Sequence, residues 1–229
     1  NINHEELSIM FMEMLNSQHG GKLSLAIEIF QNKYHKRFLH QLISSQLDVD
    51  RLDYLNRDSF YTGVQEGVIG VGRIIKLLNV KDGNLVVDRK GVYSIEKFLV
   101  ARRIMYWQVY LHKTVISAEF LLINILKKAK QLASEGVELF CSPALQEFLY
   151  HEHGKESFLQ NPDLLATFAD LDDYDILSAI KVWKKHQNYT LSKLCTWMVN
   201  RRLYSVEISK EPISHKRVSA LKEKTAMKF

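Results

Sequence analysis

Apolar residues recur at helical spacing along most of this chain, and polar residues fill the positions between them. In "HEELSIMFMEMLN", His4, Leu7, Phe11 and Met14 fall on one face of an amphipathic helix, which "HGGK" ends. Residues 23–43 predict one or two further helices. The same period continues in "SPALQEFLYHEHG", "DLLATFADL", "DDYDILSAIKVWKKH" and "YTLSKLCTWMVNRRLY". The pattern therefore predicts a mainly α-helical protein.

The stretch "QLDVDRLDYLNRDS" is a helix of unusual composition, because it sets four aspartates and two arginines among leucines, a valine and a tyrosine. Asp48 is suited to be its N-cap and Gly63 its C-terminal stop. So much charge is unusual in a core helix, and so many leucines are unusual on a solvated face. The stretch therefore predicts a helix that is only partly buried.

The middle of the chain changes character. "RIIKLLNVKDGNLVVDRKGVYS" has two β-type runs around an Asp-Gly pair, a strong hairpin signal, so we expect a two-stranded ribbon over 73–92. From Ser94, a suitable N-cap, a helical pattern runs to about Ala133 and stops at Gly136. This pattern predicts one long helix over 94–133 that forms the spine of the protein.

The fold class predicted from these elements is all-α with a small inserted β-hairpin. We expect residues 1–135, with the hairpin and the long helix, and a helical extension over 136–229 to form one compact unit. The polar tail from about Ser205 is ambiguous between a strand and an extended arm. Only three prolines occur, and no repeat or low-complexity linker divides the chain.

Composition and charge narrow the function only slightly. The net charge is +5, and the basic residues are scattered along the chain, which argues against a dedicated nucleic-acid binder. A pocket for anionic small molecules would fit this charge equally well. Two cysteines, Cys141 and Cys195, lack metal-ligand spacing and are expected to be reduced core residues of a cytoplasmic protein. No apolar run reaches the roughly 20 residues that span a bilayer, so we expect no membrane insertion.

Two helical stripes carry the candidate chemistry. In a helix, Asp50, Tyr54 and Asp58 lie at i, i+4 and i+8 on one face. Spacing alone favours an exposed face laced with Asp–Arg pairs, whereas tyrosines interleaved with carboxylates also suit a pocket for a polar ligand.

The second stripe lies on the predicted long helix, where Arg102, Tyr106, Tyr110 and Lys113 follow i, i+4, i+8 and i+11. An arginine and a lysine separated by tyrosines suit phosphate binding, because guanidinium binds phosphate oxygens in a bidentate manner. The alternative is a helix edge where long side chains cover core rings. Spacing does not decide between them.

Two further patterns are weaker. "GVIGVG" has the glycines of a dinucleotide-binding loop but lacks the strand before it and the helix after it, so we reject that interpretation. "HEH" at 151–153 has metal-binding residue types, but residues i and i+2 of a helix do not face each other. We expect a solvated histidine pair there.

The segment "SSQLDVDRLDYLNRDSFYTGV" resembles HD-domain phosphohydrolases of the deoxynucleoside-triphosphate triphosphohydrolase branch. In that family a D-x-D-(K/R)-x-D-Y-x-x-R-D segment carries the last aspartate of an H…HD…D metal site. "HEELSIMFMEML" and "FLVARRIMYWQVYLHKTV" are similar to two other family helices and follow in the family's order. The resemblance covers about residues 1–130 and implies a mainly helical HD-domain fold.

The resemblance implies a role for each matching residue. Asp50 would be the metal ligand, and His4 would act in acid/base catalysis. Arg51 would contact the triphosphate, and Arg102, with Tyr106 beside it, would hold the γ-phosphate. Tyr54 and Asp58 would contact the sugar, against which Tyr110 would pack. His112 and Lys113 would contact an allosteric nucleotide. A metal of this kind polarises a phosphate and activates water, cations neutralise the developing charge, and a histidine can shuttle the proton.

The implied activity is hydrolysis of a dNTP to deoxynucleoside and triphosphate, and it would require a divalent metal (Mg, Mn, Fe, Ni or Zn). The resemblance also implies that the enzyme is a homo-oligomer, either a dimer or a tetramer. The family's first histidine and its HD pair should precede "NINHEELS", so Asp50 is one ligand of an expected four. We expect further sequence upstream and no activity from these residues alone. The acidic residue of the family's guanine-nucleotide allosteric site would fall near Gly70, where the resemblance fails.

Two alternatives remain open. One is a non-catalytic nucleotide-binding or regulatory module that keeps the phosphate-facing residues without the full metal site. The other is single-stranded nucleic-acid binding through the arginine, lysine and tyrosine stripe, which predicts a steep loss of affinity with salt.

Overall fold

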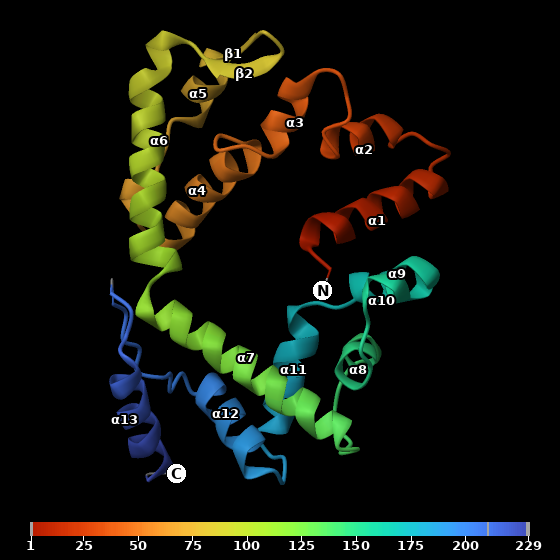
Figure 1. Cartoon of the computed structure of the whole chain (residues 1–229), viewed down its shortest axis with the longest axis vertical. Coiled ribbons are helices and arrows are strands. Elements are labelled where there is room, and N and C mark those ends of the chain that lie inside the picture. Colours follow the sequence, from red (N-terminus) through yellow and green to blue (C-terminus); the bar gives the residue numbers. More distant parts are fainter. Residues whose placement is uncertain (1, 210, 228–229) are drawn as a thin grey trace.

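The computed structural model describes residues 2–209 and 211–227, which form a mainly helical chain with a two-stranded antiparallel ribbon (Figure 1). The predicted fold class is therefore confirmed. The elements up to the ribbon are α1 (His4–Gln18), α2 (Ser24–Phe30), α3 (Arg37–Ile43), α4 (Val49–Thr62), η1 (Gln65–Gly67), α5 (Val71–Leu77), β1 (Leu78–Lys81) and β2 (Asn84–Val87). The elements that follow are η2 (Arg89–Gly91), α6 (Val92–Met105), η3 (Tyr106–Tyr110), α7 (Lys113–Ser134), α8 (Pro143–Tyr150), α9 (Lys155–Gln160), α10 (Pro162–Ala169), α11 (Asp173–Trp183), α12 (Tyr189–Val199) and α13 (His215–Ala226).

Helix α4 begins and ends as its sequence predicts. The side chain of Asp48 accepts a hydrogen bond from the backbone N–H of Arg51 at 2.8 Å, which satisfies an N–H that the helix leaves unpaired. Gly63 ends the helix in the left-handed conformation at φ 72°. Leu52 and Leu55 are buried, whereas most of the charged residues remain at least partly exposed. The prediction of a partly buried helix is confirmed.

The ribbon is shorter than predicted. Asp82 and Gly83 both have positive φ (52° and 74°), as a tight type I′ hairpin turn requires. The first β-type run, "RIIKLL", lies mostly in helix α5, so the prediction of a ribbon from residue 73 is wrong there. A short apolar run does not distinguish a strand from a buried helix. Here the helix buries Ile74 in the same core cluster as Phe98 of α6.

The predicted continuous helix over 94–133 is also wrong, because the chain bends by 57° between Tyr110 and Lys113. Helix α6 ends in a π-helical turn, η3, in which the N–H of Leu111 bonds to the carbonyl of Tyr106. The side chain of His112 then caps the next helix by accepting the N–H of Thr114. The helix also starts before the predicted N-cap at Ser94.

The buried residues form three clusters. The largest joins α7, α8, α11 and α12 around Trp183, and the second joins α4, α5 and α6 around Phe98. The third consists of Phe158, Leu164 and Leu165, and the apolar face of α1 packs against it. Helix α1 therefore rests on the second half of the chain, although α3 and α4 face its other side (Figure 1).

The arrangement is open. The accessible surface is 16274 Å², whereas a globular monomer of 26.7 kDa exposes about 10,700 Å² by the usual scaling with mass. Large apolar side chains contribute to the difference; for example, Phe60 and Tyr61 at the end of α4 are 79% and 80% exposed. Figure 1 shows α1, α4 and α7 on different sides of the molecule rather than stacked in one core.

Three other predictions bear on the rest of the chain. Cys195 is buried, which raises the pKa of its thiol to about 12, and Cys141 is half-buried; neither forms a disulfide. The tail beyond Ser205 contains helix α13, which its sequence pattern did not predict. Within the described residues no single helix has the length and apolar character to cross a membrane. Two consecutive segments, Arg89–Tyr110 and Lys113–Ser134, reach that length and apolar character only when taken together.

Candidate functional site

A cleft of about 740 Å³ separates α1 from α3 and α4 and brings together the residues predicted for catalysis. We call it the α1–α4 cleft; it is lined by His4, Glu5, Ser8, Ile9, Phe30, Gln31, Asn32, Lys33, His40, Ile43, Ser44, Asp50 and Arg51. His4 and Asp50, predicted as the acid/base histidine and the metal ligand, thus face the same cleft from different helices.

The position of His4 depends on the start of α1. Asn3 and Glu6 form a reciprocal capping box, in which each side chain accepts the other residue's backbone N–H. Glu6 also pairs with Lys155 of α9 at 2.6 Å, and this bond lowers the pKa of the Glu6 carboxyl. The first turn of α1 is therefore held both by its own cap and by the second half of the chain.

Asp50 and Arg51 differ in how firmly they are held. The side chain of Asp50 is exposed in the first turn of α4, and no hydrogen bond or ion pair joins it to another described side chain. The guanidinium of Arg51 binds the carboxylate of Asp48 and the carbonyl of Ser45 through Nη1. Arg51 still lines the cleft, so it presents a positive charge whose position is fixed by the helix N-cap.

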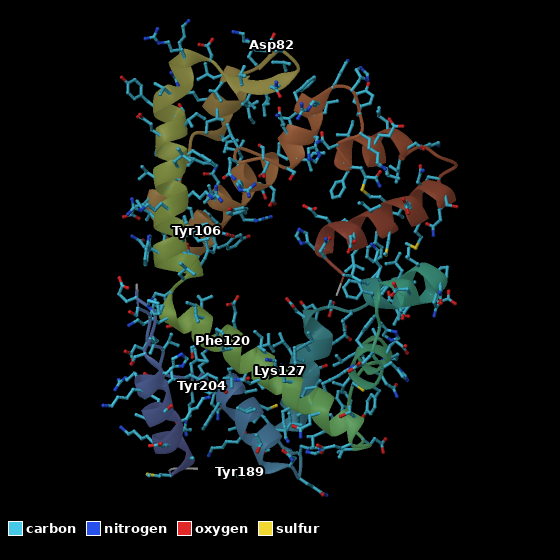
Figure 2. The ribbon with its side chains drawn as sticks, viewed as in Figure 1. Asp82, Tyr106, Phe120, Lys127, Tyr189 and Tyr204 are labelled. Atoms are coloured by element: carbon cyan, nitrogen blue, oxygen red, sulfur yellow. The ribbon has the colours of Figure 1, made fainter. Side chains whose placement is uncertain are left out.

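Further along α4, the residues predicted for the sugar and phosphates form a second group, the tyrosine cluster: Tyr54, Asp58, Arg102, Tyr106 and Tyr110. The hydroxyl of Tyr110 donates to the carboxylate of Asp58 at 2.7 Å. The ring of Tyr110 meets those of Tyr54 and Tyr106 edge to face, with centroids 6.0 and 5.3 Å apart. Tyr106 is labelled in Figure 2, at the end of α6.

Arg102 extends this cluster. Its guanidinium lies 5.9 Å from the ring centroid of Tyr106, within the range of a cation–π contact, and Nη1 donates to Gln46 at 2.9 Å. Burial, and then the bond to Asp58, raise the pKa of the Tyr110 phenol. Burial also raises the pKa of Tyr54. The phenols therefore stay protonated as hydrogen-bond donors, beside one carboxylate that can accept a ligand hydroxyl.

The cleft and the tyrosine cluster lie along one helix face. Asp50, Tyr54 and Asp58 are successive members of the i, i+4, i+8 stripe, which covers about 12 Å of helix at about 1.5 Å per residue. Such a strip suits an elongated ligand that has an anionic end near Arg51 and a hydroxyl-bearing end near Asp58.

His112 and Lys113 lie apart from this strip. Both are exposed at the start of α7, and the ring of His112 accepts the backbone N–H of Thr114 as an N-cap. The cap explains why a histidine occupies this position without any ligand. Binding of an allosteric nucleotide by this pair stays a prediction.

Three residues near the strip were not singled out from the sequence. Lys33 adds a second cation to the cleft, and His40 lines it with its ring nitrogen Nδ1 held at 3.1 Å by the carbonyl of Ile29. Gln46 positions Arg102. Lys33 lies in the α2–α3 connection and His40 on the short helix α3, and neither segment carries a motif, so only the packing of α1 across α3 shows their place. Gln46 could have been inferred from its closeness to the aspartate-rich helix.

The candidate metal site at Asp50 is incomplete within the described residues. Within the described residues, one group of three metal-binding side chains lies within reach of a single ion: Glu147, His151 and His153, in the second half of the chain. Asp50 therefore offers one carboxylate and does not hold a metal with its described neighbours. The predicted solvated histidine pair at 151–153 is wrong for His153, whose side chain is only 16% exposed.

Comparison with known proteins relates this architecture to HD proteins. A family model described as the HD associated region matches residues 69–137, which include α5, the ribbon, α6, η3 and α7. The structure of a phosphohydrolase from Bacteroides thetaiotaomicron is 56% identical, with a TM-score of 0.94 over 100% of this chain and 57% of that one. This likeness extends from the sequence to the whole fold described above.

Two curated relatives are more distant. The uncharacterised protein YwfO of Bacillus subtilis is 34% identical over 77% of this chain and 39% of its own length. A Dictyostelium discoideum protein named as a homologue of the deoxynucleoside triphosphate triphosphohydrolase SAMHD1 is 26% identical over 56% of this chain and 27% of its own. The chain spans 39% of YwfO and 57% of the Bacteroides structure. The family model and the phosphohydrolase structure together relate it to the HD-domain phosphohydrolases.

Proposed function

We propose that this HD-related chain forms the substrate-binding part of a metal-dependent phosphohydrolase that converts a dNTP to deoxynucleoside and triphosphate. The observation that carries the proposal is the continuous strip on α4, from Asp50 opposite His4 to Asp58 bonded to Tyr110. Its cationic and hydroxyl-binding ends are arranged in the order of the triphosphate and the sugar. The Dictyostelium relative's name supports the choice of substrate class.

Different residues of the chain would bind the phosphates and the sugar. Arg51 and Lys33 in the cleft, with Arg102 beside the tyrosine cluster, would bind phosphate oxygens and neutralise charge that develops in the transition state. The carboxylate of Asp58 would accept a hydroxyl of the sugar. The Tyr54 and Tyr110 rings would pack against the sugar's apolar face.

The reaction requires a proton at the leaving group. Water adds to the α-phosphorus and releases one proton, the bond between this phosphorus and the 5′-oxygen breaks, and the 5′-oxygen takes up one proton to become the deoxynucleoside hydroxyl. His4 is the group in the α1–α4 cleft suited to deliver that proton, because a histidine exchanges protons in the neutral range. Asp50, across the cleft, would face the phosphate end.

Asp50 and its described neighbours do not complete a metal site. Asp50 would contribute one carboxylate, and the other ligands would come from outside these 229 residues. Relatives that extend well beyond the matched region support this division.

Product analysis tests the proposal. Full-length protein is incubated with each dNTP and Mn²⁺ or Mg²⁺, and the products are separated to look for tripolyphosphate and deoxynucleoside. We expect both products in equal amounts from wild type and none from Asp50→Ala. A protein that binds dNTPs but never releases tripolyphosphate would instead be the nucleotide-binding module. Binding of single-stranded DNA that weakens steeply with salt, without dNTP binding, would also overturn the proposal.

We also propose that the protein is a homo-oligomer. The resemblance to HD-domain phosphohydrolases supports this, because it implies a dimer or tetramer. Light scattering coupled to size-exclusion chromatography of the full-length protein measures the mass directly, and a monomer at micromolar concentration would contradict the proposal.

A further inference from the structure

The connection between α8 and α9 gathers Glu147, His151 and His153, far along the chain from the α1–α4 cleft. One ligand atom from each lies within 4.8 Å of the others. Oε1 of Glu147 is 3.5 Å from Nδ1 of His151 and 3.0 Å from Nε2 of His153. Ligand atoms of a tetrahedral zinc site lie about 3.3 Å apart, since Zn–N and Zn–O bonds are about 2.0–2.1 Å. The distances of 3.5 and 3.0 Å from Glu147 lie on either side of this value.

The backbone explains how the three side chains meet. Glu147 lies in the last turn of α8 and His151 four residues later, on the same helix face. The helix ends at Tyr150, and His151 is already extended (φ −114°, ψ 156°). In extended backbone, residues i and i+2 lie on the same side, so His153 joins His151. The expectation of a solvated pair assumed a helix that continues through this segment.

Burial and charge at this group point to a cation. Nε2 of His153 is buried and has no hydrogen-bond partner among the described residues, because its approach to Glu147 is not aligned for a hydrogen bond. An unsatisfied buried nitrogen is unfavourable, and a metal ion would use its lone pair. The group lies at the C-terminal end of α8, where the helix dipole favours positive charge. Lys130 already binds the Phe148 and His151 carbonyls there.

We propose that Glu147, His151 and His153 bind one zinc ion, with a water molecule as the fourth ligand. A carboxylate and two imidazoles form a known zinc ligand set, and three protein ligands leave one position open. A cavity of about 440 Å³ next to the histidines provides room for that water. The rings of Phe148 and Phe158 lie edge to face against the His153 ring, at centroid distances of 5.6 and 6.4 Å, and form an apolar shell.

The proposed site has a structural consequence. Leu7 of α1 lines the same cavity, and Phe158 belongs to the cluster on which α1 packs. A zinc ion that fixes the α8–α9 connection would therefore stabilise the platform for α1, and with it the position of His4. The zinc ion itself would lie outside the α1–α4 cleft and take no part in the proposed hydrolysis.

Zinc titration of the full-length protein tests the proposal. The protein is stripped of metal with a chelator and titrated with Zn²⁺ against a chromophoric competitor. We expect His151→Ala and Glu147→Gln each to weaken one zinc site by about 100-fold or more. Because the His151 side chain is 61% exposed, its removal leaves the fold intact, as circular dichroism can verify. His35→Ala, at another exposed histidine, is the matched control and should leave zinc affinity unchanged.

Two further measurements separate this site from the one at Asp50. Asp50→Asn should keep the zinc site, and Co²⁺ in place of zinc should give a d–d spectrum that His151→Ala abolishes. In the Asp50→Asn background zinc should also raise the melting temperature, and His151→Ala added to that background should abolish the rise. Absence of zinc binding, or binding that survives His151→Ala and disappears in Asp50→Asn, would overturn the proposal and leave an ordinary Glu–His ion pair.

Discussion

The tyrosine cluster and the α1–α4 cleft lie on the same helix but are built differently. In the cluster, Tyr110 bonds to Asp58 and Arg102 bonds to Gln46, so the chain itself holds the polar groups in place. In the cleft, His4 and Asp50 come from helices far apart in the sequence. Neither side chain has a hydrogen bond or ion pair within the described part of the chain.

We interpret this difference as a separation of substrate recognition from the proposed reaction. The side chains of the cluster are already held by hydrogen bonds, so they lose little conformational entropy when a sugar binds. This preorganisation suits selection of the substrate. A cleft with free carboxylate and imidazole groups suits residues that must contact a metal, water and a moving proton. Because α1 packs on the third hydrophobic cluster, the distance across the cleft depends on the second half of the chain.

The largest effect should come from Asp50→Ala. If the free carboxylate serves the reaction, its loss should lower kcat/KM for dNTP hydrolysis by about 10³-fold while the melting temperature stays unchanged, because Asp50 supports no described contact. Asp53→Ala is the matched control on the same helix; Asp53 forms only an exposed pair with Arg57. Equal activity in both variants would place the reaction elsewhere.

His4→Ala should have the next largest effect, about 10²-fold on kcat, because the variant loses a positioned proton donor. The effect should fall mainly on kcat rather than on KM. The part of the pH–rate profile that depends on proton donation by His4 should be absent in the variant. His19→Ala, at an exposed histidine at the other end of α1, controls for the loss of an imidazole. A pH profile that is identical in wild type and His4→Ala would exclude His4 as the proton donor.

The sequence predicts those parts of this arrangement that local chemistry fixes. The α4 caps at Asp48 and Gly63 and the turn at Asp82–Gly83 each rest on a conformation that one residue type favours, and all are confirmed. The i, i+4, i+8 spacing on α4 likewise predicts a shared face, because one regular helix carries it.

Packing between distant elements is not encoded in this way. The π turn at Tyr106–Tyr110 contains no proline or glycine, yet it redirects the chain where Tyr110 reaches Asp58 on another helix. The position of His4 depends on α1 packing against Phe158, and no local pattern indicates that contact. The prediction of a solvated side chain is wrong for His153 because its neighbours depend on where α8 ends.

Tyr110→Phe tests the bonded half of the comparison. Loss of the bond to Asp58 should raise KM by about 10-fold and leave kcat nearly unchanged, as a recognition role requires. Since folding raises the pKa of this phenol, the stability it adds is full below about pH 10 and is lost as the pH rises further.

The stability difference between wild type and Tyr110→Phe should therefore shrink above pH 10 in urea unfolding. Tyr93→Phe, at a tyrosine that is 80% exposed, is the control and should show no such pH dependence. A pH-independent difference for Tyr110→Phe would argue that neither the burial of this phenol nor its bond to Asp58 persists in solution.

The smallest effect on activity should come from Gly67→Ala, which tests whether the cluster depends on the packing beneath it. A Cβ at Gly67 would lie 2.5 Å from Sδ of Met105, a fully buried side chain that directly precedes η3. The strain should lower stability by about 1–3 kcal/mol, and the shift of Met105 should raise KM a few-fold without changing kcat. Gly72→Ala is the matched control, since a Cβ there meets no atom within 4 Å and alanine favours helix α5. If Gly67→Ala lowered kcat rather than raised KM, the tyrosine cluster and the α1–α4 cleft would be one coupled unit, and the separation of recognition from reaction would be wrong.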